Sequence, residues 1–181
     1  MTMMSTETIL SAAPTLSEAD LARAQQELRD GHLLVVPTDT VYGIGADAAN
    51  PEAVAAVLAA KGRGRQMPPP VLVASVDVIG SLCVDVPDAA RTLARAFWPG
   101  GLTLILRACP DLGWDLGETG GTIGVRIAAY LDGGPTQGST ASSIVDFAHD
   151  APRALRLGTI SLDDLSAAAG VAIAPVQGSA S

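Results

Sequence analysis

The chain has 181 residues, of which 48% are hydrophobic, and its formal net charge is −8. This length suits one domain with a sizeable core, and the hydrophobic content excludes general disorder. No apolar run approaches the roughly 20 residues that a membrane helix needs. The N-terminal segment has no basic residues ahead of an apolar stretch, so a signal peptide is not predicted. The two cysteines lack metal-type spacing, so we expect reduced thiols in a cytoplasmic protein without a membrane segment.

Helical and extended patterns alternate along the chain. Ser17 caps a predicted helix that Gly31 ends, and an apolar strand follows at 33–36. A second helix begins at Pro51 and ends just before Lys61. The later predicted elements are a strand at 71–74, helices at 76–83 and 87–97, strands at 102–107, 122–131, 142–147 and 153–158, and a helix at 162–169.

This order of elements predicts an α/β fold: a single domain in which helices flank a twisted mixed β-sheet. The domain is expected to span residues 15–172. The N-terminal residues 1–14 and the C-terminal residues 173–181 are expected to be disordered tails.

Small polar side chains and glycines directly follow the first predicted strand, in the stretch "PTDTVYGIG" at residues 37–45. The residues after this strand lie at the end of the sheet, where ligands bind in α/β proteins. Threonine and aspartate offer hydrogen-bond donors and acceptors, and glycines let a ligand approach the backbone. An ordinary polar turn is the alternative interpretation of this stretch taken alone.

Three of the eleven cationic residues lie in "KGRGR" at residues 61–65, directly after the second helix. Cations near a helix C-terminus are favourable by about 0.3–1 kcal/mol, so a solvated basic turn is one interpretation. The other is a polyphosphate clamp, because guanidinium groups match phosphate oxygens in pairs.

Further polar side chains accompany the later strands. Arg126 lies within an apolar strand, where it reaches an edge, pairs with a carboxylate of the protein, or points into a pocket for a carboxylate-bearing substrate. Ser142 precedes the next strand, and Arg156 lies on the last one. The two histidines do not lie near a suitable nucleophile, so a Ser-His-Asp or Cys-His site is not predicted.

Seven stretches, taken in their order along the chain, resemble the L-threonylcarbamoyladenylate synthases, a family built on the YrdC-like domain. The matching stretches are "VVPTDTVYGIGADA", "LAAKGRGRQMPPPVLV", "AFWPGGLTLIL", "TIGVRI", "YLDGGP", "SSIVDF" and "ALRLG". They fall between residues 17 and 165, which is most of the chain.

The resemblance implies a reaction and its partners. The amine of L-threonine captures CO2 or bicarbonate as a carbamate, which attacks the α-phosphorus of ATP, with Mg²⁺ on the triphosphate, and expels pyrophosphate. The product, threonylcarbamoyl-AMP, passes to a tRNA-modifying threonylcarbamoyl transferase complex that acts on the adenosine beside the anticodon. A weak direct contact with tRNA is a further expectation.

By their positions in the family motifs, seven residues are assigned to substrate binding, and none acts as a side-chain nucleophile or binds a metal. Those expected to hold threonine or its carbamate are Thr40, Arg126 and Ser142. Those expected to hold the nucleotide are Lys61, Arg63, Thr122 and Arg156.

The chain departs from the family in one internal stretch. Family members have a helix, a strand ending in Ser-Ala-Asn-x-Ser-Gly and a further helix after the strand of Arg126, whereas "TIGVRIAAYLDGGP" here joins the flanking strands directly. Smaller departures are Leu72 in place of a histidine and Leu157 in place of a proline. In the family, the serine and asparagine of the Ser-Ala-Asn-x-Ser-Gly motif contact threonine and ATP, and neither has a counterpart here. Each lost hydrogen bond to a charged group is worth about 1.5–3 kcal/mol, so losing two is expected to slow the reaction by roughly two to four orders of magnitude. The loss of a strand is also expected to expose apolar surface.

Two alternative functions follow from the same residues. The first is an impaired family member that binds nucleotide or structured RNA, although a net charge of −8 weighs against strong RNA affinity. The second is a carbamoyl-transfer domain of the kind found in hydrogenase maturation proteins. Those proteins also carry acylphosphatase and zinc-finger segments, which this sequence lacks.

Overall fold

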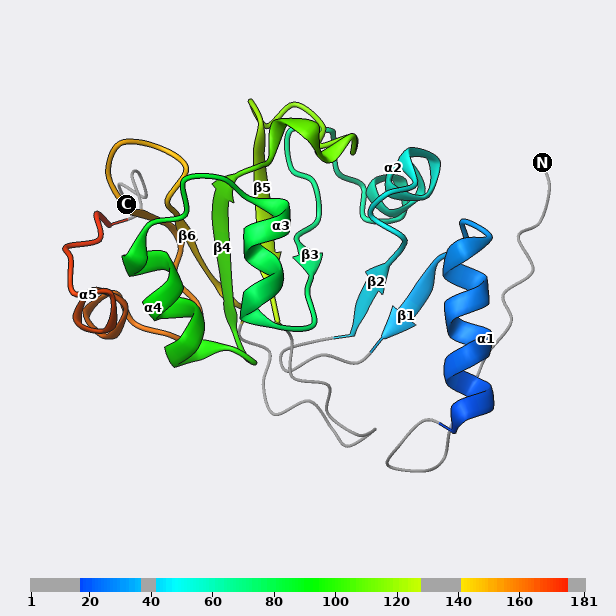
Figure 1. Ribbon diagram of the computed structural model, residues 1–181, viewed down its shortest axis with the longest axis horizontal. Helices are drawn as coiled ribbons and strands as arrows, with labels where there is room; N and C mark the ends of the chain where they lie inside the picture. Colours follow the sequence, from blue (N-terminus) through cyan, green and yellow to red (C-terminus); the bar gives the residue numbers. More distant parts are fainter. Residues whose placement is uncertain (1–16, 37–41, 128–140, 176–181) are drawn as a thin grey trace.

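The computed structural model describes residues 17–36, 42–127 and 141–175 (Figure 1). The helices in these ranges are α1 (Glu18–Arg29), α2 (Pro51–Ala60), α3 (Ile79–Leu82), α4 (Asp88–Phe97) and α5 (Leu162–Ala169). The strands are β1 (Leu34–Val36), β2 (Gly43–Gly45), β3 (Val71–Leu72), β4 (Leu102–Arg107), β5 (Thr122–Arg126), β6 (Ser143–Asp146) and β7 (Arg153–Arg156).

Local capping sequences determine where three helices begin. Ser17 and Ser161 each accept a hydrogen bond from the backbone N–H three residues further on, at 3.1 Å. Asn50 accepts two backbone N–H groups from the first turn of α2, both at 3.1 Å. These side chains satisfy donors that have no partner within the helix. The predicted starts of α1, α2 and α5 are therefore confirmed.

The main sheet has five strands in the order β3-β5-β4-β6-β7. β3 pairs with β5, and β4 with β6, in parallel, whereas the β4–β5 and β6–β7 pairs are antiparallel. The sheet is therefore mixed, and the predicted α/β fold is confirmed. The part of the predicted strand 122–131 beyond residue 127 lies outside the described residues.

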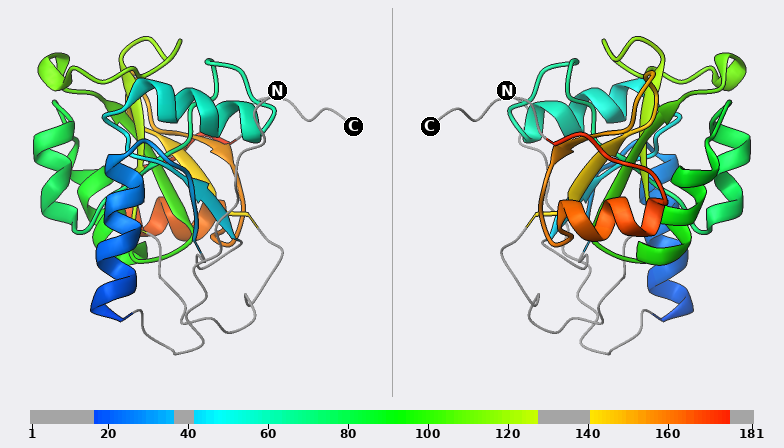
Figure 2. Two further views of the ribbon diagram at one scale, coloured as in Figure 1. Left: turned by 90° about the vertical axis from the view of Figure 1, so that its right-hand side faces the viewer. Right: turned by 90° about the vertical axis from the view of Figure 1, so that its left-hand side faces the viewer.

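α3, α4 and α5 pack against one face of this sheet, as the perpendicular views in Figure 2 show for α3 and α4. Leu102, Leu104 and Leu106 of β4 point toward these helices and are at most 1% exposed. Successive side chains of a strand point to opposite faces. In β5, Ile123 and Val125 are buried in the same core, so Thr122 and Arg126 lie on the other face of the sheet.

β1 and β2 form a separate two-stranded antiparallel sheet on the far side of β3 (Figure 1). The Gly43–Gly45 step, interpreted from the sequence as part of a turn, is a strand because it pairs with β1. α1 lies beside β1, and all of its residues stay at least partly exposed. The apolar side chains of Val35 and Tyr42 are also largely exposed.

The packed region continues past the predicted boundary at residue 172. Ile173 is buried in the main core. Ala174 accepts a hydrogen bond from the backbone N–H of Ala154 at 2.8 Å and donates one to the carbonyl of Pro152 at 2.9 Å. The domain therefore extends at least to Ala174, and the prediction that a disordered tail begins at residue 173 is wrong for these two residues.

Candidate functional site

Three predicted site residues meet at one end of the main sheet. Arg126 ends β5, Arg156 ends β7, and Ser142 immediately precedes β6. The Ser142 hydroxyl accepts hydrogen bonds from Nη2 of Arg156 at 3.1 Å and from Nη1 of Arg126 at 3.5 Å. The Ser142 carbonyl accepts a third, from Nε of Arg156, at 2.8 Å. Two guanidinium groups from different strands therefore converge on one serine.

The turn between α4 and β4 holds Arg126 from the other side. Arg126 is only 7% exposed, and its Nη2 donates to the carbonyl of Gly100 at 3.3 Å. The indole of Trp98 is buried beneath this turn and donates to the carbonyl of Leu102 at 2.8 Å. Arg126 therefore does not reach an exposed edge, which was one of the interpretations of its strand position.

Two structural residues, Ser143 and Gly158, lie beside Ser142. The Ser143 hydroxyl donates to the carbonyl of Ile160 and accepts the backbone N–H groups of Gly158 and Ile160. A Cβ atom on Gly158 would collide with the carbonyl oxygen of Ala141. The two serines thus have different roles: Ser142 faces the arginines, and Ser143 fixes the turn after β7. The two adjacent hydroxyls before a strand favour loop capping from the sequence alone, and Ser143 has this role.

Arg63, in the basic segment 61–65, acts electrostatically on both Lys61 and Arg156. Lys61 caps the C-terminus of α2. Burial, followed by the positive charge of Arg63, lowers the pKa of the Lys61 ammonium. Burial also lowers the pKa of Arg156, and the charges of Arg63 and Arg126 lower it further. Arg63 is therefore near enough to both groups to repel them, and such a cluster of cations favours an anionic ligand.

Thr122 does not lie in this cluster. It begins β5 whereas Arg126 ends it, so about 13 Å of extended strand separates them. Both side chains are on the same face of the sheet, and the Thr122 hydroxyl donates to the carbonyl of Thr119 at 3.1 Å. Thr40, the remaining predicted residue, lies outside the described residues.

An ion pair that the sequence did not predict connects the basic segment to the loop before β5. The guanidinium of Arg65 donates to both carboxylate oxygens of Asp115, each at 2.8 Å. The hydrogen bonds from Arg65, together with one from the backbone N–H of Gly117, lower the pKa of Asp115 to about 2. The carbonyl of Arg65 also accepts the N–H of Glu118 at 3.0 Å. Residues 63–65 are thereby fixed against residues 115–118.

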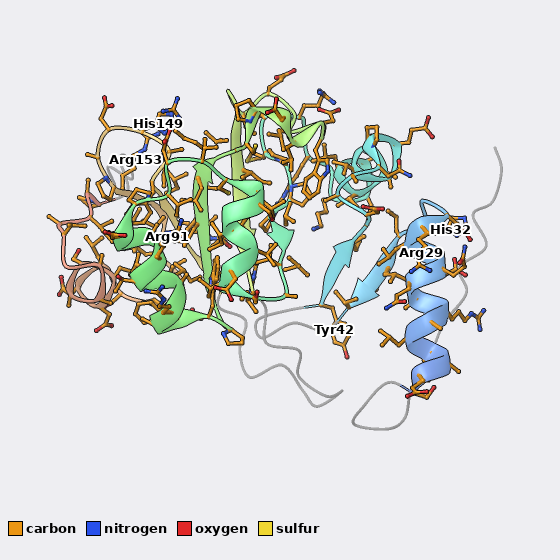
Figure 3. The ribbon with its side chains drawn as sticks, viewed as in Figure 1. Arg29, His32, Tyr42, Arg91, His149 and Arg153 are labelled. Atoms are coloured by element: carbon orange, nitrogen blue, oxygen red, sulfur yellow. The ribbon has the colours of Figure 1, made fainter. Side chains whose placement is uncertain are left out.

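A second charged cluster occupies a different edge of the sheet and has a structural role. The Asp146 carboxylate is buried and accepts hydrogen bonds from Nε of Arg153 at 3.0 Å and from the backbone N–H of Ala148 at 2.9 Å. His149 Nδ1 lies 2.8 Å from the same carboxylate. Figure 3 shows His149 and Arg153 beside each other, far from Tyr42. Arg153 compensates the charge of a buried carboxylate here.

Residues 17–36, 42–127 and 141–175 contain no group of three histidine, cysteine or acidic side chains placed to hold a metal ion. Within the same ranges, no helix combines the length and hydropathy needed to cross a bilayer.

Comparison with known proteins gives a family with the same architecture. The sequence model of the Sua5/YciO/YrdC family, described as "Telomere recombination", matches residues 26–130, which is more than half of the chain. A relative from Bacillus subtilis, named threonylcarbamoyl-AMP synthase, is 31% identical over 85% of this chain and 58% of its own length. The structure of Pyrococcus abyssi Sua5 complexed with L-threonine superposes with a TM-score of 0.78 at 26% identity. This superposition covers 88% of the chain but only 60% of the Sua5 chain.

A relative from Mycobacterium tuberculosis, provisionally named for the same activity, is 38% identical over 96% of this chain and 100% of its own length. That alignment spans 216 residues, whereas this chain has 181, so at least 35 of its positions have no counterpart here. This difference agrees with the internal stretch that the sequence lacks. The relatives carry the names of enzymes, and the chain belongs to the Sua5/YciO/YrdC family.

Proposed function

We propose that this protein makes threonylcarbamoyl-AMP from L-threonine, bicarbonate or CO2, and ATP, with release of pyrophosphate. The observation that carries the proposal is the convergence of Arg126 and Arg156 on Ser142, with Arg63 in electrostatic reach. The names of the relatives support the reaction, and the Sua5 structure complexed with threonine supports the amino acid substrate.

On the threonine side, a buried guanidinium and a hydroxyl suit a carboxylate or carbamate. Arg126 donates a hydrogen bond to the carbonyl of Gly100, and this contact orients its guanidinium. A fixed guanidinium pairs with a carboxylate through two parallel hydrogen bonds. Ser142 offers a hydroxyl within the same group, and Thr40 is the third residue proposed to contact threonine.

On the nucleotide side, Lys61, Arg63 and Arg156 bind the phosphates of ATP, which enters as its Mg²⁺ complex. Their mutual repulsion in the free protein is relieved when phosphate charge arrives, so binding is favoured electrostatically. Thr122 lies about 13 Å along β5 from Arg126, a separation that suits the nucleoside end of an extended nucleotide.

The chemistry requires positioning and charge neutralisation. The threonine amine forms a bond to the carbon of CO2 and loses a proton, which gives the carbamate. A carbamate oxygen then bonds to the α-phosphorus as the bond from that phosphorus to the pyrophosphate oxygen breaks. Charge accumulates on the phosphate oxygens during this step, where Arg63 and Arg156 stabilise it. No covalent bond to the protein forms.

The product is proposed to pass, in the cytoplasm, to a threonylcarbamoyl transferase complex that modifies tRNA. Because relatives have residues with no counterpart in this chain, we expect turnover roughly two to four orders of magnitude below theirs. A nucleotide-binding protein with lost catalysis is the second candidate, and the same alignment difference favours it.

The test is to incubate the purified chain with ATP, L-threonine, bicarbonate and Mg²⁺ and to measure pyrophosphate. Release that requires threonine, and that Arg126→Ala abolishes, supports the proposal. No release above background, even at high protein concentration, contradicts it. ATP binding without release then indicates the nucleotide-binding alternative.

A further inference from the structure

Strand β7 has one residue more than the part of β6 with which it pairs. One pair joins Val145 to Ala154. The next pair joins Ile144 to Arg156, so Leu155 is an extra residue between the two pairs. An extra residue of this kind is a β-bulge, and a bulge changes the direction of the side chains that follow it.

This bulge determines on which face of the sheet Arg156 lies. Residues two apart in a regular strand point to the same face, and Ala154 is buried in the main core. Without the bulge, Arg156 would therefore point into that core. Because of the bulge, Arg156 is opposite Ile144 on the other face, where its guanidinium contacts Ser142. The place of Arg156 in the cationic cluster thus depends on one inserted residue.

The Ser143 hydroxyl holds the chain directly after this bulge. β7 ends at Arg156, and the hydroxyl accepts the backbone N–H groups of Gly158 at 2.9 Å and of Ile160 at 3.2 Å. It also donates to the carbonyl of Ile160 at 2.9 Å. A hydroxyl has one donor and two acceptor positions, so these three hydrogen bonds use its full capacity. Since Ser143 is also fully buried, it acts on the protein rather than on a ligand.

Ser143 is connected to the turn beside Arg126 as well. Its backbone N–H donates to the carbonyl of Gly101 at 2.8 Å. The preceding residue, Gly100, accepts a hydrogen bond from Nη2 of Arg126 at 3.3 Å. One buried serine therefore links the turn that orients Arg126 to the turn that follows Arg156.

We propose that Ser143 is a positioning residue, whose hydroxyl holds Arg156 in the direction in which it binds phosphate. This inference rests on the proposed function, which assigns Arg156 to the nucleotide phosphates. Ser143 acts through Arg156, so its effect on phosphate binding disappears when the guanidinium is removed. A serine that only stabilised the fold would have the same effect on binding with or without Arg156.

The experiment compares threonine with valine in place of Ser143, because these two side chains have the same shape and only threonine has a hydroxyl. Ser143→Thr and Ser143→Val are each made in the original chain and in Arg156→Ala, which keeps Lys61 and Arg63 for the anion. Calorimetric titration with inorganic tripolyphosphate at low salt measures the affinity, and circular dichroism verifies that each variant is folded. If Ser143→Val does not fold, Ser143→Cys takes its place, with the original residue as its reference.

Ser166→Ala is the matched control. The Ser166 hydroxyl also accepts a backbone N–H, that of Ile173 at 3.3 Å, and so fixes a turn in the same manner. It lies on α5, which packs against the face of the sheet opposite to Arg156. Ser166→Ala is therefore expected to bind tripolyphosphate as the original chain does, within about twofold.

With Arg156 present, we expect Ser143→Val to bind tripolyphosphate about 3- to 10-fold more weakly than Ser143→Thr, which is less than the loss of one whole hydrogen bond to a charged group. In Arg156→Ala the difference is expected to fall within about twofold. Equal affinities with Arg156 present overturn the positioning role and leave the synthase proposal intact, and so does a difference that persists in Arg156→Ala. If the original chain does not bind tripolyphosphate, the phosphate cluster and the proposed function fail together with the positioning role.

Discussion

The part of the chain around the five-stranded sheet and the part containing α1, β1 and β2 differ in how they bury apolar surface. Leu104 of β4 is fully buried beneath α3, α4 and α5, whereas Val35 of β1 is 67% exposed. Regions with few buried apolar contacts open locally at lower free energy than a packed core does. We therefore expect the main sheet to unfold last.

This difference bears on the candidate site. Arg126, Ser142 and Arg156 all lie on the main sheet, so the packed core fixes their positions. Val35 of β1, Tyr42 beside β2 and Leu72 of β3 have exposed apolar surface. The additional residues of the relatives are the expected cover for this surface, because a lost strand exposes the edges that it paired with.

The largest expected effect comes from removing the buried arginine. Arg126→Ala deletes hydrogen bonds to Ser142 and Gly100 and the proposed contact with the substrate. With about 1.5–3 kcal/mol for each hydrogen bond to a charged group, we expect kcat/KM for threonine to fall about 10²- to 10⁴-fold. Arg107→Ala, at the other end of β4 with a loose 3.8 Å ion pair, is the control and should fall less than twofold. Equal losses in both variants would contradict the assignment.

The contrast between the two regions predicts unequal stability effects. Leu104→Ala leaves a cavity in the main core and is expected to lower the free energy of unfolding by about 2–5 kcal/mol. Val35→Ala removes a largely exposed side chain, and we expect a change within about 0.5 kcal/mol. Urea unfolding of both variants measures the difference. Similar values would show that the two regions are packed equally well.

A glycine tests how tightly the core holds the site. In Gly158→Ala the new methyl group meets the carbonyl of Ala141 and displaces the backbone before Ser142. We expect a loss of about 1–3 kcal/mol in unfolding free energy, together with weaker phosphate binding through Arg156. Gly80→Ala is the matched control, because open space surrounds Gly80 in α3, and it should be neutral or slightly stabilising. An unchanged free energy of unfolding in the Gly158→Ala variant would show that the turn adjusts freely.

The smallest expected effect concerns the exposed ion pair between Arg65 and Asp115. The folded pKa of Asp115, about 2, is below its ordinary value of 3.8. The ion pair therefore stabilises the folded state above about pH 4, and this contribution is lost as the pH falls through 2. In Arg65→Gln we expect the Asp115 pKa to return most of the way to 3.8, as measured by NMR titration of the carboxyl carbon. An unchanged titration would mean that Gly117, rather than Arg65, sets this pKa.

Sequence reasoning predicted most of the elements of the fold because their signals are local. Ser17, Asn50 and Ser161 show where helices begin, and the apolar runs indicate the strands of the main sheet. The pairing of β2 with β1 was missed because "GIG" lacks strand-forming side chains apart from one isoleucine. The buried position of Ile173 was missed because a short apolar stretch near a terminus gives no periodicity.

The site was predicted less completely, because it depends on contacts between residues far apart in the sequence. Family motifs assign Arg126, Ser142 and Arg156 to substrate binding, and the structure brings these three side chains into contact. Motif order could not show that Thr122 is at the opposite end of β5 from Arg126. It also could not show that Arg65 pairs with Asp115, which lies 50 residues away, because neither residue has a local partner signal.

Transfer of labelled carbon from bicarbonate tests the central claim most directly. The purified chain is incubated with ¹⁴C-bicarbonate, threonine and Mg²⁺–ATP, and the nucleotides are separated and analysed by mass. The account predicts a labelled product that contains both AMP and threonine, that requires all three substrates, and that is absent with Arg126→Ala. A chain that binds ATP but forms no such product, at any protein concentration tested, would contradict it.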